Sequence, residues 1–202
     1  MPGETHPEAP SRQSLAIVAG PNGSGKTTFY KLYLAQTYPL FIKADEFSRT
    51  LDLDRPEAER SRQAAVWADA ERHRLLGQRT SFAFETVFSR TAHWLDFIRW
   101  AKDLGYTINL HFICTETPGI NVTRIQTRVE DGGHPVPPDK VLKRYPLSMQ
   151  TALAARHLVD EFWLHDNTVR DRTHLLVARF TGASVVYVGE SVPAWARPFL
   201  DS

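Results

Sequence analysis

The segment between Gly20 and Thr27 carries the clearest chemical signal in the sequence. Its residues are Gly20, Pro21, Asn22, Gly23, Ser24, Gly25, Lys26 and Thr27, and Thr28 follows them. This order matches the pattern G-x-x-x-x-G-K-[ST], in which glycines let backbone N–H groups turn toward a polyphosphate. The Lys26 ammonium can lie between the β- and γ-phosphates, and the Thr27 hydroxyl can ligate Mg²⁺. The motif predicts a nucleotide-binding loop with a Mg²⁺ requirement, and we expect Lys26 on the solvent-facing side of that loop.

Two carboxylates are placed where a kinase needs acidic groups. Asp45 follows a short apolar pair at the edge where α/β sheets bind ligands. Its carboxylate can accept a hydroxyl proton or hold Mg²⁺ through water, and the alternative is a helix N-cap. Glu85 lies in an aromatic-rich alternating segment, on the face opposite to the phenylalanines. Because a buried charge is costly unless paired, Glu85 indicates either a ligand site or an ion pair with an arginine, and Thr86 can add a hydroxyl contact.

Arginines flank a Gly/Pro-rich loop at residues 131–138 that reads as a lid hinge. Arg124 and Arg128 stand at positions i and i+4 of one predicted helix, so both can face one ligand, and Arg144 follows the loop. A guanidinium binds phosphate oxygens bidentately and stays charged. We expect one of the three to contact the γ-phosphate, although an ordinary solvated helix face remains the alternative. Asn167, after the last predicted sheet strand, either reaches the nucleotide base or closes an Asx turn.

Five further segments, read in order, resemble one family of kinases. They are KADEF (43–47), SFAFET (81–86), RVEDGGH (128–134), KRY (143–145) and DNT (166–168). Together with the loop, they resemble the zeta toxin family of P-loop small-molecule kinases in its short, single-domain bacterial form. The similarity runs from about Leu15 to Thr168.

This resemblance implies an activity and a set of residue roles. Members transfer the γ-phosphate of ATP or GTP to a sugar hydroxyl of UDP-N-acetylglucosamine, and some are toxins held by an antitoxin. The resemblance makes Asp45 the general base, Glu85 a substrate ligand and Arg128 the phosphate contact. It leaves Arg124 and Arg144 as further candidates, because Gly132-Gly133-His134 stands where larger toxins carry a second arginine. We expect the residues that recognise the acceptor between Leu51 and Arg79.

The elements that must position these residues alternate between strands and helices. We expect strands at residues 15–20, 41–42, 81–88, 106–114, 161–165, 175–180 and 184–188. Helices are expected at 27–36, after Pro56 to about 78, at 91–104, 118–129 and 139–160, the last kinked at Pro146. This alternation predicts a three-layer α/β/α fold with a mostly parallel sheet. The resemblance further implies the P-loop NTPase architecture of adenylate and shikimate kinases.

The composition excludes several other classes. The chain has 202 residues, a net charge of +1 and a single cysteine, so a cysteine-rich zinc site is excluded. We expect a flexible tail at residues 1–13, one domain at 14–202 with a lid around 124–145, and a cytoplasmic protein without membrane contact. A small-molecule acceptor is expected and nucleic acid is disfavoured by the low charge. A regulatory ATPase that acts through protein binding and a polynucleotide end kinase remain the alternatives.

Overall fold

A seven-stranded sheet in the order β2-β3-β1-β4-β5-β6-β7 forms the centre of the computed structural model. The structure describes residues 12–48, 50–51, 54–130, 132–133, 135–169 and 174–201. The strands are β1 (Ser14–Ala19), β2 (Phe41–Ile42), β3 (Phe82–Thr86), β4 (Thr107–Cys114), β5 (Glu161–Asp166), β6 (Leu175–Thr181) and β7 (Ser184–Val188). The strands from β2 to β5 pair in parallel, and β6 and β7 are antiparallel. The expected α/β fold with a mostly parallel sheet is confirmed.

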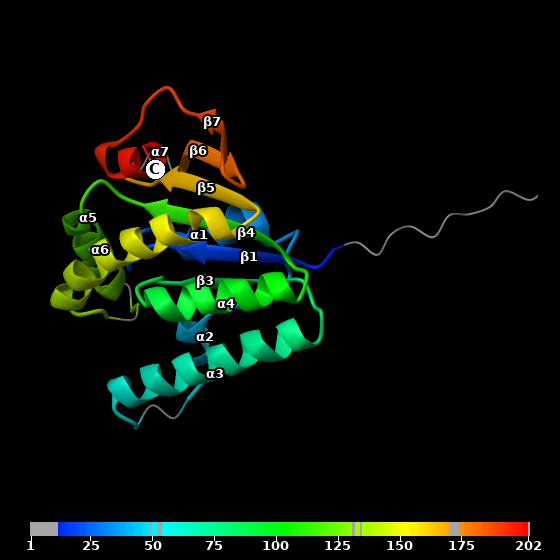
Figure 1. Ribbon diagram of the computed structural model, residues 1–202. Coiled ribbons are helices and arrows are strands. Elements are labelled where there is room, and N and C mark those ends of the chain that lie inside the picture. The colour runs from blue at the N-terminus through cyan, green and yellow to red at the C-terminus, as the bar shows by residue number, and fades with distance from the viewer. Residues whose placement is uncertain are drawn as a thin grey trace, which may run out of the picture.

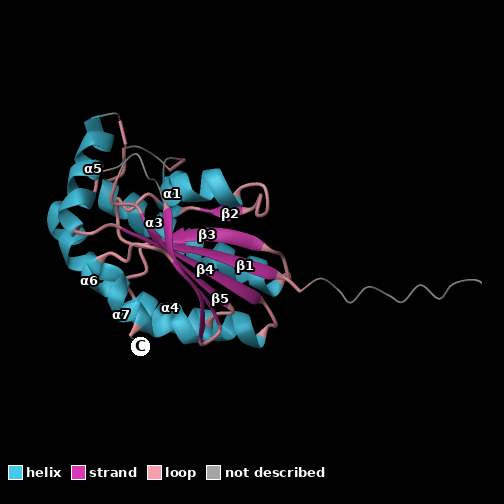
Figure 2. Cartoon of the chain, turned by 90° about the horizontal axis from the view of Figure 1, so that it is seen from above, coloured by secondary structure: helices cyan, strands magenta, loops and turns pink. Residues whose placement is uncertain are grey.

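Helices cover both faces of this sheet, as Figures 1 and 2 show. The α-helices are α1 (Lys26–Phe29), α2 (Ala44–Ser48), α3 (Glu57–Gly77), α4 (Thr91–Asp103), α5 (Pro118–Glu130), α6 (Pro138–Ala155) and α7 (Arg197–Leu200). Three further helical turns are η1 (Tyr30–Leu34), η2 (Arg156–Leu158) and η3 (Ala194–Ala196). In Figure 2, α1 lies on one side of the sheet, whereas α4 and α7 lie on the other.

Strand β1 is buried on both faces and separates two apolar cores. Leu15 and Ile17 face the larger core, which includes side chains of α3, α4, α6 and α7. Ala16 and Val18 face the smaller core, formed with α1 and η1. A continuous apolar run is what a central parallel strand requires, because helices pack on both of its sides. The run therefore fixes where β1 ends and where the phosphate loop begins.

The helix expected at residues 27–36 differs from the structure. Its first turn is α-helical, but η1 is a π-helical turn in which the Ala35 N–H donates to the Tyr30 carbonyl at 3.0 Å. This wider turn rotates the following side chains, so Leu34 packs into the smaller core while Leu32 and Tyr33 are exposed. Phe29 and Leu34 are thus buried apolar side chains of this segment, a spacing of five residues that fits a π turn and not the 3.6-residue period of an α-helix.

The other differences lie at element boundaries. The strand expected at 81–88 ends at Thr86, and Phe88 adopts a positive φ of 62° while its ring stays in the larger core. Pro146 lies inside α6, as expected. No helix within the described ranges is both long and apolar enough to cross a membrane. Residues 1–11 lie outside the described residues, so the expected tail at 1–13 stays a prediction. The single domain at 14–202 and the lid at 124–145 also stay predictions.

Candidate active site

The phosphate loop connects β1 to α1 at the carboxyl edge of the parallel strands. Gly20, Gly23 and Gly25 have φ values of 145°, 79° and 99°, which side chains rarely allow. A Cβ on Gly20 would lie 2.1 Å from the carbonyl oxygen of Ile113 in β4, so glycine is needed there. In the same loop, the Ser24 N–H donates to the Pro21 carbonyl at 3.3 Å. The loop therefore folds as a compact turn before the N-terminus of α1.

Lys26 is buried at the first position of α1, which corrects the expected solvent-facing position. Its Nζ donates to the carbonyl oxygens of Gly20 and Pro21, both at 2.9 Å. Burial lowers the pKa of Lys26, whereas the carboxylates of Glu85 and Asp45 raise it. The sequence did not indicate this burial because the loop wraps around the lysine side chain.

Two cations join those carboxylates around Lys26. Arg128 of α5 and Lys43, which precedes α2, act on the ammonium and lower its pKa. Four charged groups, from the segment around α2, from β3 and from α5, thus act electrostatically on Lys26 of α1. The structure brings the candidate residues Lys26, Asp45, Glu85 and Arg128 together, although they span more than a hundred residues of sequence.

Thr27 and Glu85 form a direct hydrogen bond. The Thr27 hydroxyl donates to Glu85 Oε2 at 2.6 Å, from α1 to the end of β3. Glu85 thus has a hydroxyl partner, where the sequence allowed either a ligand or an arginine. Hydroxyl and carboxylate oxygens are the donors that Mg²⁺ prefers, so this pair fits a magnesium ion that also binds substrate phosphates. The sequence analysis named Thr27 and Asp45 as metal ligands and did not include Glu85. Thr28, the last residue named with the phosphate loop, is exposed.

Asp45 is exposed in the first turn of α2 and is not the cap of that helix. The N–H groups of Glu46 and Phe47 donate to the carbonyl of Lys43, at 3.2 and 3.4 Å, so Lys43 occupies the N-cap position. The N-cap alternative for Asp45 is therefore wrong. Its carboxylate remains exposed to solvent while it acts electrostatically on Lys26.

The three arginines are in different environments. Arg124 Nη2 donates to the Thr168 carbonyl at 3.2 Å, and Arg128, one turn further along α5, is exposed. Arg144 is half-buried on α6, and no contact among the described residues brings its side chain to the phosphate loop. Of the three, Arg128 is the one that interacts with Lys26. His134 of the expected hinge lies outside the described residues.

Thr86 and Asn167 make contacts that the sequence did not predict. The Thr86 hydroxyl oxygen accepts from the Phe88 N–H at 3.0 Å, and the Thr86 carbonyl accepts from the Gly20 N–H at 3.2 Å. Asn167 is buried, and its Nδ2 donates to the Ser24 carbonyl at 2.8 Å. The turn after β5 is closed by Asp166, which accepts from the Thr168 hydroxyl at 2.6 Å, so the expected Asx turn at Asn167 is wrong.

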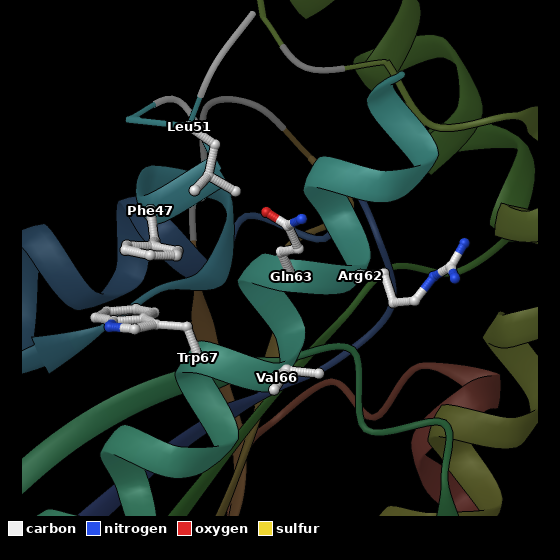
Figure 3. Close-up of a pocket in the computed structure, with 6 residues that line it drawn as sticks. All are labelled: Phe47, Leu51, Arg62, Gln63, Val66 and Trp67. Carbon is white, nitrogen blue, oxygen red and sulfur yellow. The ribbon is translucent and has the colours of Figure 1, made fainter. Parts of the chain in front are cut away.

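A pocket of about 410 Å³ lies between α3 and α2, the helix that carries Asp45. Its lining residues are Phe47, Leu51, Arg62, Gln63, Val66 and Trp67, drawn in Figure 3. The rings of Phe47 and Trp67 stack with their centroids 4.2 Å apart and 10° between their planes. Five of the six residues lie in the 51–79 segment in which acceptor recognition was expected, and the sixth, Phe47, lies two residues after Asp45. No motif marked them, because helical packing alone brings them together.

Comparisons with known proteins agree with this architecture. A family model described as an AAA domain matches residues 15–151. An uncharacterised protein of Haemophilus influenzae is 28% identical over 138 residues, which cover 66% of this chain and 94% of that protein. The family match includes the phosphate loop, both candidate carboxylates and the helix α5.

Two solved structures share the fold. A chain of the AvrRxo1-ORF1:AvrRxo1-ORF2 complex with sulphate ions is 17% identical, with a TM-score of 0.69 over 95% of this chain and 64% of that chain. A chain from the PezAT chromosomal toxin-antitoxin system of Streptococcus pneumoniae is also 17% identical, with a TM-score of 0.63 over 95% of this chain and 79% of that chain. This chain thus spans less than two thirds of the AvrRxo1 chain. The fold implied by the zeta toxin resemblance is confirmed.

Proposed function

The chain belongs to the AAA domain family, and from this premise we propose that it is a nucleotide-dependent small-molecule kinase. The single observation that carries the proposal is the site around the buried Lys26 ammonium, where Thr27 is hydrogen-bonded to Glu85 and the charges of Asp45, Glu85 and Arg128 act on the lysine. Phosphoryl transfer needs positioning and charge neutralisation more than covalent chemistry. A cationic centre flanked by two carboxylates and an arginine supplies those requirements.

The phosphate loop and its neighbours bind the nucleotide in this proposal. The loop N–H groups and Lys26 hold the phosphates of ATP or GTP, and Arg128 stabilises the charge on the transferring phosphoryl group. Thr27 and Glu85 would hold Mg²⁺, which neutralises phosphate charge. The AvrRxo1 complex has also been solved with ATP, which supports ATP as the nucleotide here.

Asp45 activates the acceptor hydroxyl, and the pocket between α2 and α3 binds the acceptor. Asp45 accepts the proton of the acceptor hydroxyl, because its carboxylate is exposed and yet close enough to Lys26 to act on it electrostatically. The pocket holds the remainder of the acceptor, two residues along α2 from Asp45. We assign a sugar hydroxyl as the acceptor, in a nucleotide sugar such as UDP-N-acetylglucosamine, on the strength of the zeta toxin resemblance.

The remaining parts of the proposal concern the whole chain. Residues 14–202 act as one kinase domain, and the segment 124–145 acts as a lid that excludes water. Arg124 and Arg144 are secondary candidates for phosphate and acceptor contacts. The PezAT chain comes from a toxin-antitoxin system, which supports an antitoxin as a candidate partner. A cytoplasmic location completes the proposal.

The substitution Asp45→Asn tests the assignment of the general base. The amide keeps the volume of the side chain but cannot take a proton at neutral pH, so kcat for phosphoryl transfer should fall by about 10²-fold or more. Nucleotide affinity should stay nearly unchanged, because Asp45 is not part of the phosphate loop. The measurement is a paired titration of nucleotide binding and acceptor phosphorylation at low and high Mg²⁺.

A matched control is available one residue away. Glu46 is also exposed in the first turn of α2, and its carboxylate pairs with Lys43 at 3.7 Å. Glu46→Gln should leave turnover close to that of the wild type. Near-normal turnover in a folded Asp45→Asn variant would remove Asp45 from the mechanism. Partial rescue by extra Mg²⁺, with weakened nucleotide binding, would make Asp45 a metal ligand instead of the base.

A further inference from the structure

The back of the phosphate loop is held by two side chains from the connection between β5 and β6. Asn167 Nδ2 donates to the Ser24 carbonyl at 2.8 Å, and His174 Nε2 lies 3.1 Å from the Gly25 carbonyl. Both side chains are buried. Because a carbonyl oxygen only accepts, Nε2 of His174 must carry the proton in this contact. Two successive loop carbonyls are therefore each bound by a side chain that is distant in sequence.

These two side chains are also joined to one another and to the sheet. The Asn167 Oδ1 accepts from the His174 N–H at 3.4 Å, and the Asn167 N–H donates to the Cys114 carbonyl at 2.8 Å. His174 adopts a positive φ of 57°, an uncommon conformation for a residue other than glycine. Such strain persists only where the surrounding structure requires it, and here it brings the imidazole to the loop.

Gly25 leaves the space that Asn167 and His174 occupy behind the loop. A Cβ at this position would lie 2.2 Å from Asn167 Nδ2 and 3.1 Å from His174 Nε2. The glycine before Lys26 is thus required by the two supporting side chains as well as by its φ of 99°. Sequence reasoning treated it only as part of the phosphate motif.

Because a peptide group is planar, holding its carbonyl oxygen also fixes the direction of its N–H group. In a trans peptide the C=O and the following N–H point in opposite directions. When Asn167 holds the Ser24 carbonyl, the Gly25 N–H points to the other side of the loop, and His174 fixes the Lys26 N–H in the same way. The Gly25 carbonyl also accepts from the Phe29 N–H at 3.0 Å, so the first turn of α1 is fixed by the same group.

We propose that Asn167 and His174 are positioning residues that aim the Gly25 and Lys26 N–H groups at the nucleotide phosphates. This inference rests on the proposed nucleotide binding and replaces the direct contact of Asn167 with the base. It predicts how the binding of two ligands should change. The two side chains act on phosphate recognition alone, so their loss should weaken the binding of inorganic tripolyphosphate and of ATP by the same factor.

The test compares binding of Mg²⁺-ATP and Mg²⁺-tripolyphosphate to full-length variants by calorimetry. His174→Phe removes the donor while keeping an aromatic ring beside Phe29, whose ring centroid is 5.4 Å from that of His174. Asn167→Leu removes the other donor at similar volume. Each should raise Kd for both probes by about fivefold or more, the scale of one lost hydrogen bond. His174→Gln, which keeps an N–H donor, should stay within about twofold of the wild type.

His111→Phe is the matched control, because His111 is buried against the same Phe29 ring at 5.2 Å but contacts no loop carbonyl in the described residues. Its Kd values should match those of the wild type. Weaker ATP binding with unchanged tripolyphosphate binding in Asn167→Leu would overturn the inference in favour of a base contact. An equal loss in His111→Phe would overturn it in favour of general packing. A wild-type chain that binds neither probe would instead overturn the proposed function itself.

Discussion

At the scale of single residues, the site depends on the groups that offset the cost of burying the Lys26 charge. Lys26 is enclosed by its own loop and donates to two loop carbonyls, while carboxylates on β3 and α2 offset the cost of burial. A phosphate group arriving at this point would meet a preorganised cation and would need little rearrangement of the protein. Preorganised charge of this kind is the main contribution a protein makes to phosphoryl transfer.

Arg128→Ala tests the proposed contact of this arginine with the transferring phosphoryl group. Its charge gains importance as charge moves onto the phosphoryl group, so kcat should fall by about 10²-fold or more while nucleotide Kd changes little. Arg99→Ala is the control, because Arg99 is an exposed arginine paired with Asp96 on α4 at 2.9 Å. Steady-state kinetics and nucleotide titration decide the result. A change in affinity alone would make Arg128 a ground-state anchor, and no change at all would move the role to Arg124 or Arg144.

The sequence singled out candidate residues that the structure brings together, but it did not predict their contacts. The spacing of the loop motif was sufficient to locate Lys26 and Thr27, and the resemblance pointed to Asp45, Glu85 and Arg128. The Thr27–Glu85 hydrogen bond could not be predicted because it depends on the pairing of β1 with β3. The burial of Lys26 could not be predicted because it depends on how the loop folds around the lysine side chain. His174 was missed entirely, since an isolated histidine in a loop gives no signal before the fold brings it to Gly25.

At the scale of elements, a group of buried histidines links β4 and β5 to the helix that follows the loop. His111 Nδ1 lies 3.4 Å from His165 Nε2, and the Phe29 ring packs on both imidazoles. Burial lowers the pKa of His111 to about 3 and the pKa of His165 well below its usual value. Both residues are therefore neutral in the folded protein at physiological pH.

These shifted pKa values predict a loss of stability in mild acid. The unfolded chain binds a proton at each histidine near pH 6.5, whereas the folded chain does not, so stability is full above about pH 6.5 and falls as the pH decreases. By pH 5 the neutral His111 alone should cost about 2 kcal/mol, and His165 adds to the loss in the same direction. Urea unfolding of the wild type and His111→Phe at several pH values between 5 and 7.5 measures this. The variant should show a shallower slope, and identical slopes would contradict the burial of a neutral His111.

The pocket between α2 and α3 predicts a separation of acceptor binding from nucleotide binding. Val66 lines the pocket and is 66% exposed, so Val66→Glu should place a charge on its apolar wall without disturbing the core. We expect KM for the acceptor to rise by about tenfold and the nucleotide Kd to stay constant. Ala65→Glu, at the preceding position of α3, which is also exposed but does not line the pocket, is the control. Equal effects of the two substitutions would show that the pocket does not hold the acceptor.

The alternation of elements was predictable from periodicity, and the exceptions have local causes. The helix expected at residues 91–104 is observed as α4 (Thr91–Asp103), and its buried side chains Trp94, Phe97 and Ile98 follow the 3.6-residue repeat of a regular helix. The segment after α1 broke this rule through its π turn, and its buried face could not be derived from spacing.

At the scale of the whole molecule, the parallel order of β3, β1, β4 and β5 is what assembles the site. Their carboxyl ends lie at one edge of the sheet, so segments that are far apart in sequence end beside the phosphate loop. This is the edge at which open α/β sheets bind ligands. The chain could be assigned a kinase-like fold from its sequence, whereas the acceptor could not be, because its pocket is formed by helix packing and carries no motif.

The measurement that tests the central claim most directly is acceptor-dependent transfer of the γ-phosphate. The full-length chain is incubated with Mg²⁺-ATP and a panel of hydroxyl acceptors that includes nucleotide sugars, and ADP release and product mass are followed together. We expect one class of small-molecule acceptor to raise ADP release and to gain one phosphoryl group in equal amount. ADP release at the same rate with and without every acceptor, or a phosphoryl group found only on polynucleotide ends, would contradict the assignment of this protein as a small-molecule kinase.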